Sequence, residues 1–352
     1  MHDLRTLLGI ELPIIQAPMA GVQASALAIA VSNAGGLGSL PCALLSSEQM
    51  QQELEAIRTA SAKPFNVNFF CHRSPQASDA QLAAWRNALA PYYAELGIDM
   101  DSIPTGPGRN PFDSAQADVL EKFKPPVVSF HFGLPAEDLL ERVRSWRPKI
   151  ISSATTVDEA LWLEARGVDV IIAQGIEAGG HRGMFLSDDV STQIGTFALL
   201  PQIVRAVKVP VIAAGGIADA SGIHAATALG AAGVQLGTAF LLCPECTTSA
   251  LHRAALKNEN ARHTALTNVF TGRAARGIVN RIIRELGPMS ELAPPFPLAT
   301  GAVVPLRARA EANGSGDFSP LWSGQNVSGC REVPAAQLLK DLAVSVEAIF
   351  DV

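Results

Sequence analysis

Eight short apolar runs recur along the chain, and their alternation with amphipathic stretches is the feature that most restricts its possible folds. Each run has five to seven residues, and stretches of about 10 to 15 residues with helical spacing separate most of them. This alternation is typical of βα units and a parallel sheet. The expected strands are 13–18, 37–41, 64–70, 127–132, 149–154, 169–174, 209–214 and 232–238.

Helical spacing between these strands is accompanied by recognisable start signals. Ser46, Thr156 and Asp219 stand where N-caps are expected, and Glu159 follows Thr156 by three residues, as in a capping box. The expected helices are 24–34, 46–60, 78–97, 135–146, 156–166, 196–207 and 219–229.

Two connections are too long to be simple loops. Residues 71–126 follow the third strand and contain an extra helical stretch and a Gly/Pro-rich loop near 104–112, while 242–352 follow the eighth strand. We therefore expect an α/β fold: an eight-stranded (β/α)8 TIM-type barrel over 1–241, with the insertion 71–126 after strand three and a C-terminal helical addition, 242–352, covering the substrate site. A doubly wound open sheet is the alternative, because periodicity alone does not show whether the sheet closes.

Composition disfavours several classes of partner. The formal net charge is −6 and no Lys/Arg run of five occurs, so neither nucleic acid nor an anionic membrane surface is an expected partner. No apolar stretch approaches the roughly 20 residues of a membrane span, and the N-terminus lacks a signal-peptide core, so a cytoplasmic protein is expected. Five scattered cysteines predict free thiols, and the pair Cys243 and Cys246 lacks a second pair at zinc spacing, so no metal site is expected.

The carboxyl ends of barrel strands carry catalytic groups, so the residues at those ends are candidates for function. The sixth expected strand runs into QGIEAGGHRG (174–183), where Gln174 and the glycines 179 and 180 precede His181. Glycines let a loop lie against a flat ligand and present the imidazole to it. A turn histidine bonded to a neighbouring carbonyl is the structural alternative for His181.

The next two strands end in AAGGI (213–217) and QLGTAF (235–240). In many α/β barrels the loops after strands seven and eight hold a phosphate through backbone N–H groups. Gly215, Gly216, Gly237 and Thr238 fit such a site, with close helix–strand packing as the alternative reason for these glycines.

Other strand ends supply further candidates. Pro18 and Met19 stand at the end of the first strand, where a ring-shaped ligand could stack, and Asn68 is expected either to bind a ligand or to join a network inside the barrel. His131 ends the fourth strand as either a core residue or a substrate contact. The remaining histidines, His72, His224, His252 and His263 among them, are expected at the surface or in helix packing.

These stretches resemble the nitronate monooxygenase family, formerly called 2-nitropropane dioxygenases, and its class I in particular. The matching segments cover most of the chain in order: IIQAPMAGV (14–22), NAGGLGSL (33–40), PFNVNFFCHR (64–73), VVSFHFGLP (127–135), AQGIEAGGHRG (173–183), PVIAAGGI (210–217), VQLGTAFLLCPE (234–245), TALTNVFTGRAARGIVNR (264–281) and LWSGQ (321–325).

The resemblance implies non-covalent FMN and oxidation of an alkyl nitronate, with nitroalkanes as possible substrates, by O₂ to a carbonyl compound and nitrite. It implies His181 as the catalytic residue, and we expect His131 near the substrate. The expected cofactor-binding residues are Ala17, Pro18, Met19, Asn68, Gln174, Gly179, Gly180, Gly215, Gly216, Gln235, Leu236, Gly237 and Thr238.

Two questions stay open in the sequence. His181 could act as a base toward nitroalkanes or hold a nitronate as imidazolium, and the resemblance to nitronate-using enzymes favours the second. Residues 294–307 contain Phe296 but lack the Tyr and Lys expected there, and 38–48 lacks an expected aromatic residue, which disfavours a small carboxylated nitronate.

Other functions remain as alternatives. One is an FMN-dependent NAD(P)H reductase acting on a quinone or an enoyl thioester. A flavin-free phosphate-binding aldolase or isomerase is a third possibility, although no strand end carries the Lys that a Schiff-base aldolase needs. The sequence makes no prediction of the oligomeric state.

Overall fold

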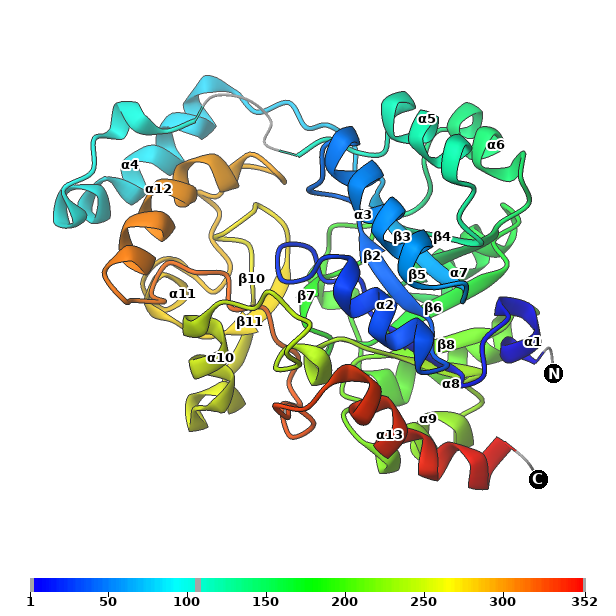
Figure 1. Cartoon of the computed structure of the whole chain (residues 1–352). Coiled ribbons are helices and arrows are strands. Elements are labelled where there is room, and N and C mark those ends of the chain that lie inside the picture. The colour runs from blue at the N-terminus through cyan, green and yellow to red at the C-terminus, as the bar shows by residue number, and fades with distance from the viewer. Residues whose placement is uncertain (1–2, 105–108, 351–352) are drawn as a thin grey trace.

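A barrel of eight parallel strands forms the centre of the computed structural model, which describes residues 3–104 and 109–350 (Figure 1). The strand order is β1-β9-β8-β6-β5-β4-β3-β2. The barrel closes because Gln16 N donates to the Leu37 carbonyl at 2.9 Å and Leu37 N donates to the Ile14 carbonyl at 2.9 Å. The predicted TIM-type barrel is confirmed, and the open-sheet alternative is wrong. The strands are β1 (Ile14–Gln16), β2 (Gly38–Pro41), β3 (Phe65–Phe70), β4 (Val127–His131), β5 (Lys149–Ala154), β6 (Val170–Gln174), β8 (Val211–Ala214) and β9 (Gly233–Leu236).

Helices surround this barrel and bury their apolar faces against it. The chain's last helix, α13, packs between α9 and α2, with Leu338, Leu339 and Leu342 in the main apolar core. Residues near the C-terminus therefore complete the ring of helices, as Figure 1 shows. The outer helices are α2 (Ser25–Asn33), α3 (Ser47–Ala60), α5 (Ser114–Phe123), α6 (Glu137–Arg144), α7 (Val157–Glu164), α8 (Thr196–Ala206), α9 (Ala220–Ala228) and α13 (Ala335–Phe350), and α1 (Leu4–Leu8) precedes the first strand.

The predicted helix starts are confirmed, with one correction. Ser46, Thr156 and Asp219 are N-caps whose side chains accept backbone hydrogen bonds. Glu159 does not complete a capping box with Thr156. Its carboxylate instead accepts from Thr155 N at 2.6 Å and from Phe185 N at 2.6 Å. These two hydrogen bonds connect the start of α7 to the loop after β7 (Gly180–His181).

A second layer lies over one side of the barrel, where the insertion meets the C-terminal part of the chain (Figure 1). Helix α4 of the insertion packs on α12, and Trp85 Nε1 and Tyr93 Oη donate to the carbonyls of Ala299 and Ala302 at 3.2 and 2.7 Å. Part of the Gly/Pro-rich loop expected near 104–112 lies outside the described residues, at 105–108. The elements here are α4 (Asp79–Leu96), α10 (Ala250–Lys257), α11 (Arg281–Leu286), α12 (Ala299–Ala312), β10 (Thr264–Thr267) and β11 (Ala275–Ile278).

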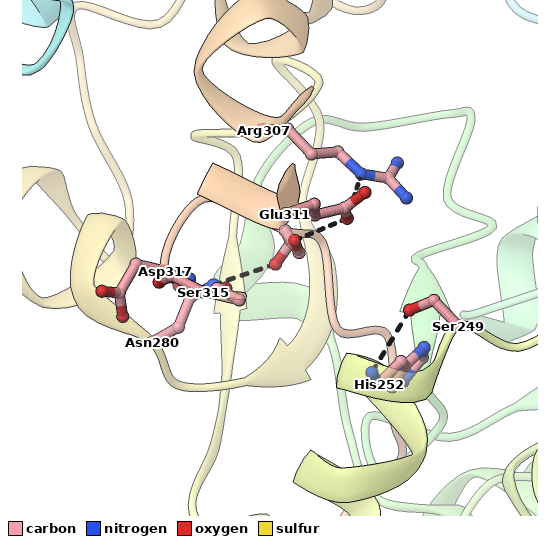
Figure 2. A network of polar contacts seen from close by, with 9 residues as sticks. Ser249, His252, Asn280, Arg307, Glu311, Ser315 and Asp317 are labelled. Atoms are coloured by element: carbon pink, nitrogen blue, oxygen red, sulfur yellow. Dashed lines mark hydrogen bonds and ion pairs between the residues drawn. The ribbon is translucent and has the colours of Figure 1, made fainter. Parts of the chain in front are cut away.

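Polar contacts fix the segment that leads from α12 back to the barrel (Figure 2). Glu311 accepts from Arg307 Nε and Ser319 Oγ, each at 2.7 Å. Asn280 Nδ2 donates to the carbonyls of Gly316 and Ser319 at 2.8 and 2.9 Å. These contacts hold residues 316–319 against the start of α11 and against α12.

Two further observations concern the expectations from composition. All five cysteines are free thiols, with Cys243 and Cys246 buried, as the sequence predicts. Within residues 3–104 and 109–350, no helix is both long enough and apolar enough to span a bilayer.

Candidate active site

One large cavity opens at the carboxyl ends of the barrel strands. Its empty space, with the open mouth and the adjoining solvent included, is about 1380 Å³. The predicted site residues that line it are Ala17, Pro18, Met19, Asn68, His131, Gln174, Gly179, Gly180, His181, Gly215, Gly216, Gln235, Gly237 and Thr238.

Leu236 is the predicted cofactor residue that the structure does not bring to the cavity. Its side chain is buried in the apolar core and its carbonyl accepts from Ala17 N at 2.8 Å. Alternation along β9 explains the difference, because neighbouring side chains point to opposite faces of a strand. Gln235 faces the cavity and Leu236 faces the surrounding helices.

Glycines let the loops at the cavity pack closely against neighbouring segments. A Cβ on Gly179 would lie 2.5 Å from Gly324 N, and one on Gly237 would lie 3.3 Å from Ala17 Cβ. Gly216 adopts φ +74°, a conformation that L side chains disfavour. The loops after β6, β8 and β9 therefore depend on glycine for their shape.

The predicted phosphate loops present unused donors. The backbone N–H groups of Gly216, Gly237 and Thr238 find no acceptor among the residues that the structure describes. Thr238 Oγ1 accepts from Gly324 N at 2.9 Å, so its proton is still available for donation. Gly216 is exposed and Gly237 and Thr238 are half-buried, and a phosphate would supply acceptors for their N–H groups.

His181 is held beside the cavity by the small antiparallel sheet. Strand β7 pairs with β11, placing His181 opposite Ala275. Its Nε2 lies 2.9 Å from Thr271 Oγ1, and its ring centroid lies 5.3 Å from that of Phe296 and 5.5 Å from that of Trp322. The imidazole therefore has fixed neighbours on the side away from the barrel.

The surroundings of His181 favour its neutral form. Burial lowers the pKa of His181 well below its usual value, and the charges of Arg109 and Arg273 lower it further. This direction disfavours the imidazolium role that the sequence led us to expect. A neutral imidazole has a free lone pair, so this direction is compatible with the role of base.

Two buried side chains shape the loop before His181. Gln174 Nε2 donates to the His181 carbonyl at 3.0 Å, and Gln174 Oε1 accepts from Gly183 N at 2.7 Å. Arg182 is fully buried and donates to the Gln174 and Gly175 carbonyls at 2.6 Å each and to Gln193 Oε1 at 3.0 Å. The loop is consequently tied to the end of β6 from both sides.

His131 lines the cavity, but both of its ring nitrogens have partners in the protein. Nδ1 lies 2.7 Å from Ser153 Oγ and Nε2 lies 3.2 Å from the His181 carbonyl. Burial lowers the pKa of His131 to about 3, which keeps the ring neutral. Its polar atoms support the backbone of His181, and a substrate would meet the carbon face of the ring.

Asn68 combines the two roles expected for it. Its Nδ2 donates to Ser129 Oγ at 2.9 Å, inside the barrel. The Oδ1 atom is left without a partner in the described part of the chain, and the residue lines the cavity. Asn68 can thus accept one hydrogen bond from a bound molecule.

The structure adds residues that sequence reasoning missed. Arg109 lines the cavity and forms no hydrogen bond or ion pair through its guanidinium with any described residue, and burial together with Arg307 lowers its pKa to about 10. Trp322, Gly324 and Asn326 approach from the C-terminal segment. The segment LWSGQ supported the family resemblance, but nothing in it predicted a place at the cavity. Arg109 could not be predicted either, because it lies in the insertion and not at the end of a barrel strand.

His72 was placed wrongly, because it is buried outside any helix, whereas His252 is buried on helix α10, in line with the expected helix packing. His72 and His252 are buried, at 5% and 4% exposure, and His252 lines the cavity. His252 Nε2 lies 3.1 Å from the Trp322 carbonyl, and burial lowers its pKa to about 4. Helix α10 folds back toward the barrel, a tertiary contact that strand-end reasoning does not contain.

Fold and site together define an α/β-barrel enzyme with its active site at the carboxyl ends of the strands. The nitronate monooxygenase family model matches residues 2–345, so the chain belongs to this family, whose members are flavoenzymes in general. The chain is 44% identical over 342 residues to a nitronate monooxygenase of Pseudomonas aeruginosa, covering 96% of each chain.

Solved structures agree with this assignment. A nitroalkane oxidase from Streptomyces ansochromogenes superposes with a TM-score of 0.89 at 40% identity, covering 99% of this chain and 100% of that one. FabK from Thermotoga maritima superposes with a TM-score of 0.73 at 27% identity, covering 99% and 96%. The protein is an enzyme of the nitronate monooxygenase type. In its described residues, no group of three or more His, Cys, Asp or Glu side chains could hold a metal ion.

Proposed function

We propose that the protein binds FMN non-covalently and oxidises alkyl nitronates with O₂ to a carbonyl compound and nitrite. The single observation that carries this proposal is the convergence of the phosphate-loop donors, the glycine loop 179–180 and His181 on one cavity. When bound, FMN supplies electron transfer and the reaction with O₂. The cytoplasmic location expected from the sequence is part of the same proposal.

The residues fit the cofactor in a specific way. The N–H groups of Gly216, Gly237 and Thr238 would hold the phosphate, where donors otherwise lack acceptors. Gly179 and Gly180 line the cavity where the flat ring would lie against the loop, and Asn68 Oδ1 would accept a hydrogen bond from it. Gln235 and the 17–19 segment form the facing wall of the cavity.

The charged groups around the cavity fit an anionic substrate. Arg109 is a cation without an anionic partner in the described chain, and it is close enough to His181 to be the largest charge influence on that ring. A nitronate carries a negative charge on its nitro oxygens, which Arg109 can neutralise by charge-assisted hydrogen bonds. We therefore assign anion binding to Arg109 and the base role, needed only for neutral nitroalkanes, to His181.

The decisive test is oxygen uptake by the FMN-loaded enzyme with a series of alkyl nitronates and their neutral parents. Oxygen uptake with release of nitrite and a carbonyl product is expected for the nitronates. Anaerobic mixing with NADH or NADPH is the companion measurement. Rapid bleaching of the flavin, without nitronate oxidation, would favour the reductase alternative, and protein that does not retain added FMN would contradict both.

A further inference from the structure

We propose that Thr271 is a positioning residue that determines which ring nitrogen of His181 carries the proton. The inference rests on the proposed function, because it concerns the base role of His181. Thr271 itself does not line the cavity. Its Oγ1 lies 2.9 Å from His181 Nε2, so any influence on a substrate passes through the imidazole.

The turn that carries Thr271 is rigidly held. Thr271 N and Gly272 N donate to the Asn268 carbonyl at 3.2 and 2.7 Å. Gly272 has φ +87°, and a Cβ there would lie 2.1 Å from the Pro294 carbonyl oxygen. Thr271 is buried, at 3% exposure. Strand β11 begins four residues later and pairs with β7 opposite His181, so hydroxyl and imidazole belong to one small framework.

Counting hydrogen bonds indicates the direction of the Thr271–His181 contact. A threonine hydroxyl has one proton to donate and lone pairs with which to accept. The Arg273 carbonyl lies 3.4 Å from Thr271 Oγ1, and no other donor in the described residues reaches it. If the hydroxyl donates to the Arg273 carbonyl, its oxygen accepts from His181 Nε2–H, and the hydroxyl, the carbonyl and Nε2 all have partners. The reverse direction leaves the carbonyl without a donor.

This direction leaves the lone pair on Nδ1. That atom has no hydrogen-bond partner in the described chain and is not sealed from the cavity, in contrast to Nδ1 of His72. Proton removal from a neutral nitroalkane then breaks the α C–H bond, leaves the electron pair on the nitronate and transfers the proton to Nδ1. The Nε2–H bond to Thr271 is retained throughout. In the opposite tautomer Nδ1 carries a hydrogen, so it has no lone pair with which to accept the proton from the substrate.

Three variants separate this role from a general effect on folding. Thr271→Val keeps the shape and removes the hydroxyl, while Thr271→Ser keeps the hydroxyl. Thr267→Val is the matched control, because Thr267 is also fully buried near this turn but its hydroxyl accepts from Val269 N and does not contact His181.

The first measurement is the ¹⁵N NMR spectrum of the FMN-loaded enzyme labelled at histidine, with the His181 signals assigned by their loss in His181→Asn. We expect the Nε2–H tautomer in the wild type, Thr271→Ser and Thr267→Val, and a shift toward Nδ1–H in Thr271→Val. The second measurement is kcat/KM for a neutral nitroalkane and for its preformed nitronate. Thr271→Val should lose about 10- to 100-fold with the neutral form only, and Thr271→Ser should restore most of that activity.

The outcomes are distinct. An unchanged tautomer and unchanged nitroalkane kinetics in Thr271→Val would overturn the proposal, as would equal losses in the Val and Ser variants. Equal losses with both substrate forms would assign Thr271 a merely structural role, which also overturns it. A wild type that oxidises no nitronate would contradict the proposed function instead, and the NMR measurement would still decide the tautomer.

Discussion

Gln174 clamps the loop that carries His181, since its Nε2 donates to the His181 carbonyl at 3.0 Å while its Oε1 accepts from Gly183 N at 2.7 Å. The clamp connects the last residue of β6 to the small sheet above the barrel. It also refines the cofactor role implied by the family resemblance. One N–H of the Gln174 amide remains for a ligand. The other N–H and the amide oxygen hold the loop that positions His181.

Gln174→Met tests the clamp, because methionine has a similar length and no amide. We expect the free energy of unfolding to fall by about 1 to 3 kcal/mol, since the Gly183 N–H and the His181 carbonyl lose partners. The kcat/KM for nitroalkanes should fall about tenfold or more. Urea unfolding and oxygen uptake measure the two effects. Gln202→Met, at an exposed site on α8, should change neither.

Gly216→Val tests the phosphate loop. A branched side chain would occupy the space beside the unpaired N–H groups and would strain a backbone at φ +74°. The purified variant should lack most of its FMN, measured as flavin absorbance relative to protein. Gly97→Val is the control, because Gly97 also has positive φ, at +61°, but ends α4 with no atom near its missing Cβ. Full retention of FMN by Gly216→Val would contradict the placement of the phosphate.

Arg109→Met tests anion binding at the cavity. Loss of a cation that would bind the nitronate oxygens should raise KM for nitronates by about 10- to 100-fold. KM for neutral nitroalkanes should change little, because these substrates lack the full negative charge. Arg73→Met, at an exposed site just after β3, is the matched control for loss of one positive charge. Equal KM effects with both substrate forms would contradict the assignment.

Sequence reasoning located the barrel and most of the site because both follow local rules. Period, length and cap residues predicted the eight strands, and strand ends predicted the loops that carry Gln174, Gly216 and Thr238. The strand β7 has two residues, too few for any periodic pattern, and its pairing with β11 joins segments about a hundred residues apart. Arg109 and Trp322 reach the cavity through such tertiary contacts, for which the sequence holds no local signal.

The buried histidines predict how stability depends on pH. Burial lowers the pKa of His131 to about 3 and of His72 and His252 to about 4, so the folded protein binds fewer protons than the unfolded chain below pH about 6.5. The contribution of these neutral histidines to the free energy of unfolding is fully present above pH about 6.5 and is lost as the pH falls toward 4.

Urea unfolding between pH 7.5 and 5 should show this loss directly. His252→Gln should reduce the slope by up to about 1.4 kcal/mol per pH unit, the value for one proton. His224→Gln, at an exposed site on α9, is the control and should leave the slope unchanged. A wild-type stability that stays constant or rises as the pH falls would contradict the burial of neutral rings.

His181→Asn separates the two chemical roles of this residue by the choice of substrate. Burial and the surrounding cations hold the His181 pKa well below its usual value, so the ring is neutral at physiological pH and can take a proton from a nitroalkane. We expect the variant to lose about 10²- to 10⁴-fold in kcat/KM with neutral nitroalkanes, the usual yield of general base catalysis. Preformed nitronates need no proton removed and should react almost normally.

The imidazolium role predicts the reverse pattern. His181→Asn would then lose activity with nitronates, and the nitronate activity of the wild type would fall as the pH rises through the histidine pKa. Oxygen uptake with both substrate forms, on protein that retains FMN, decides between these patterns, and equal activity of wild type and variant with both forms would remove His181 from the chemistry.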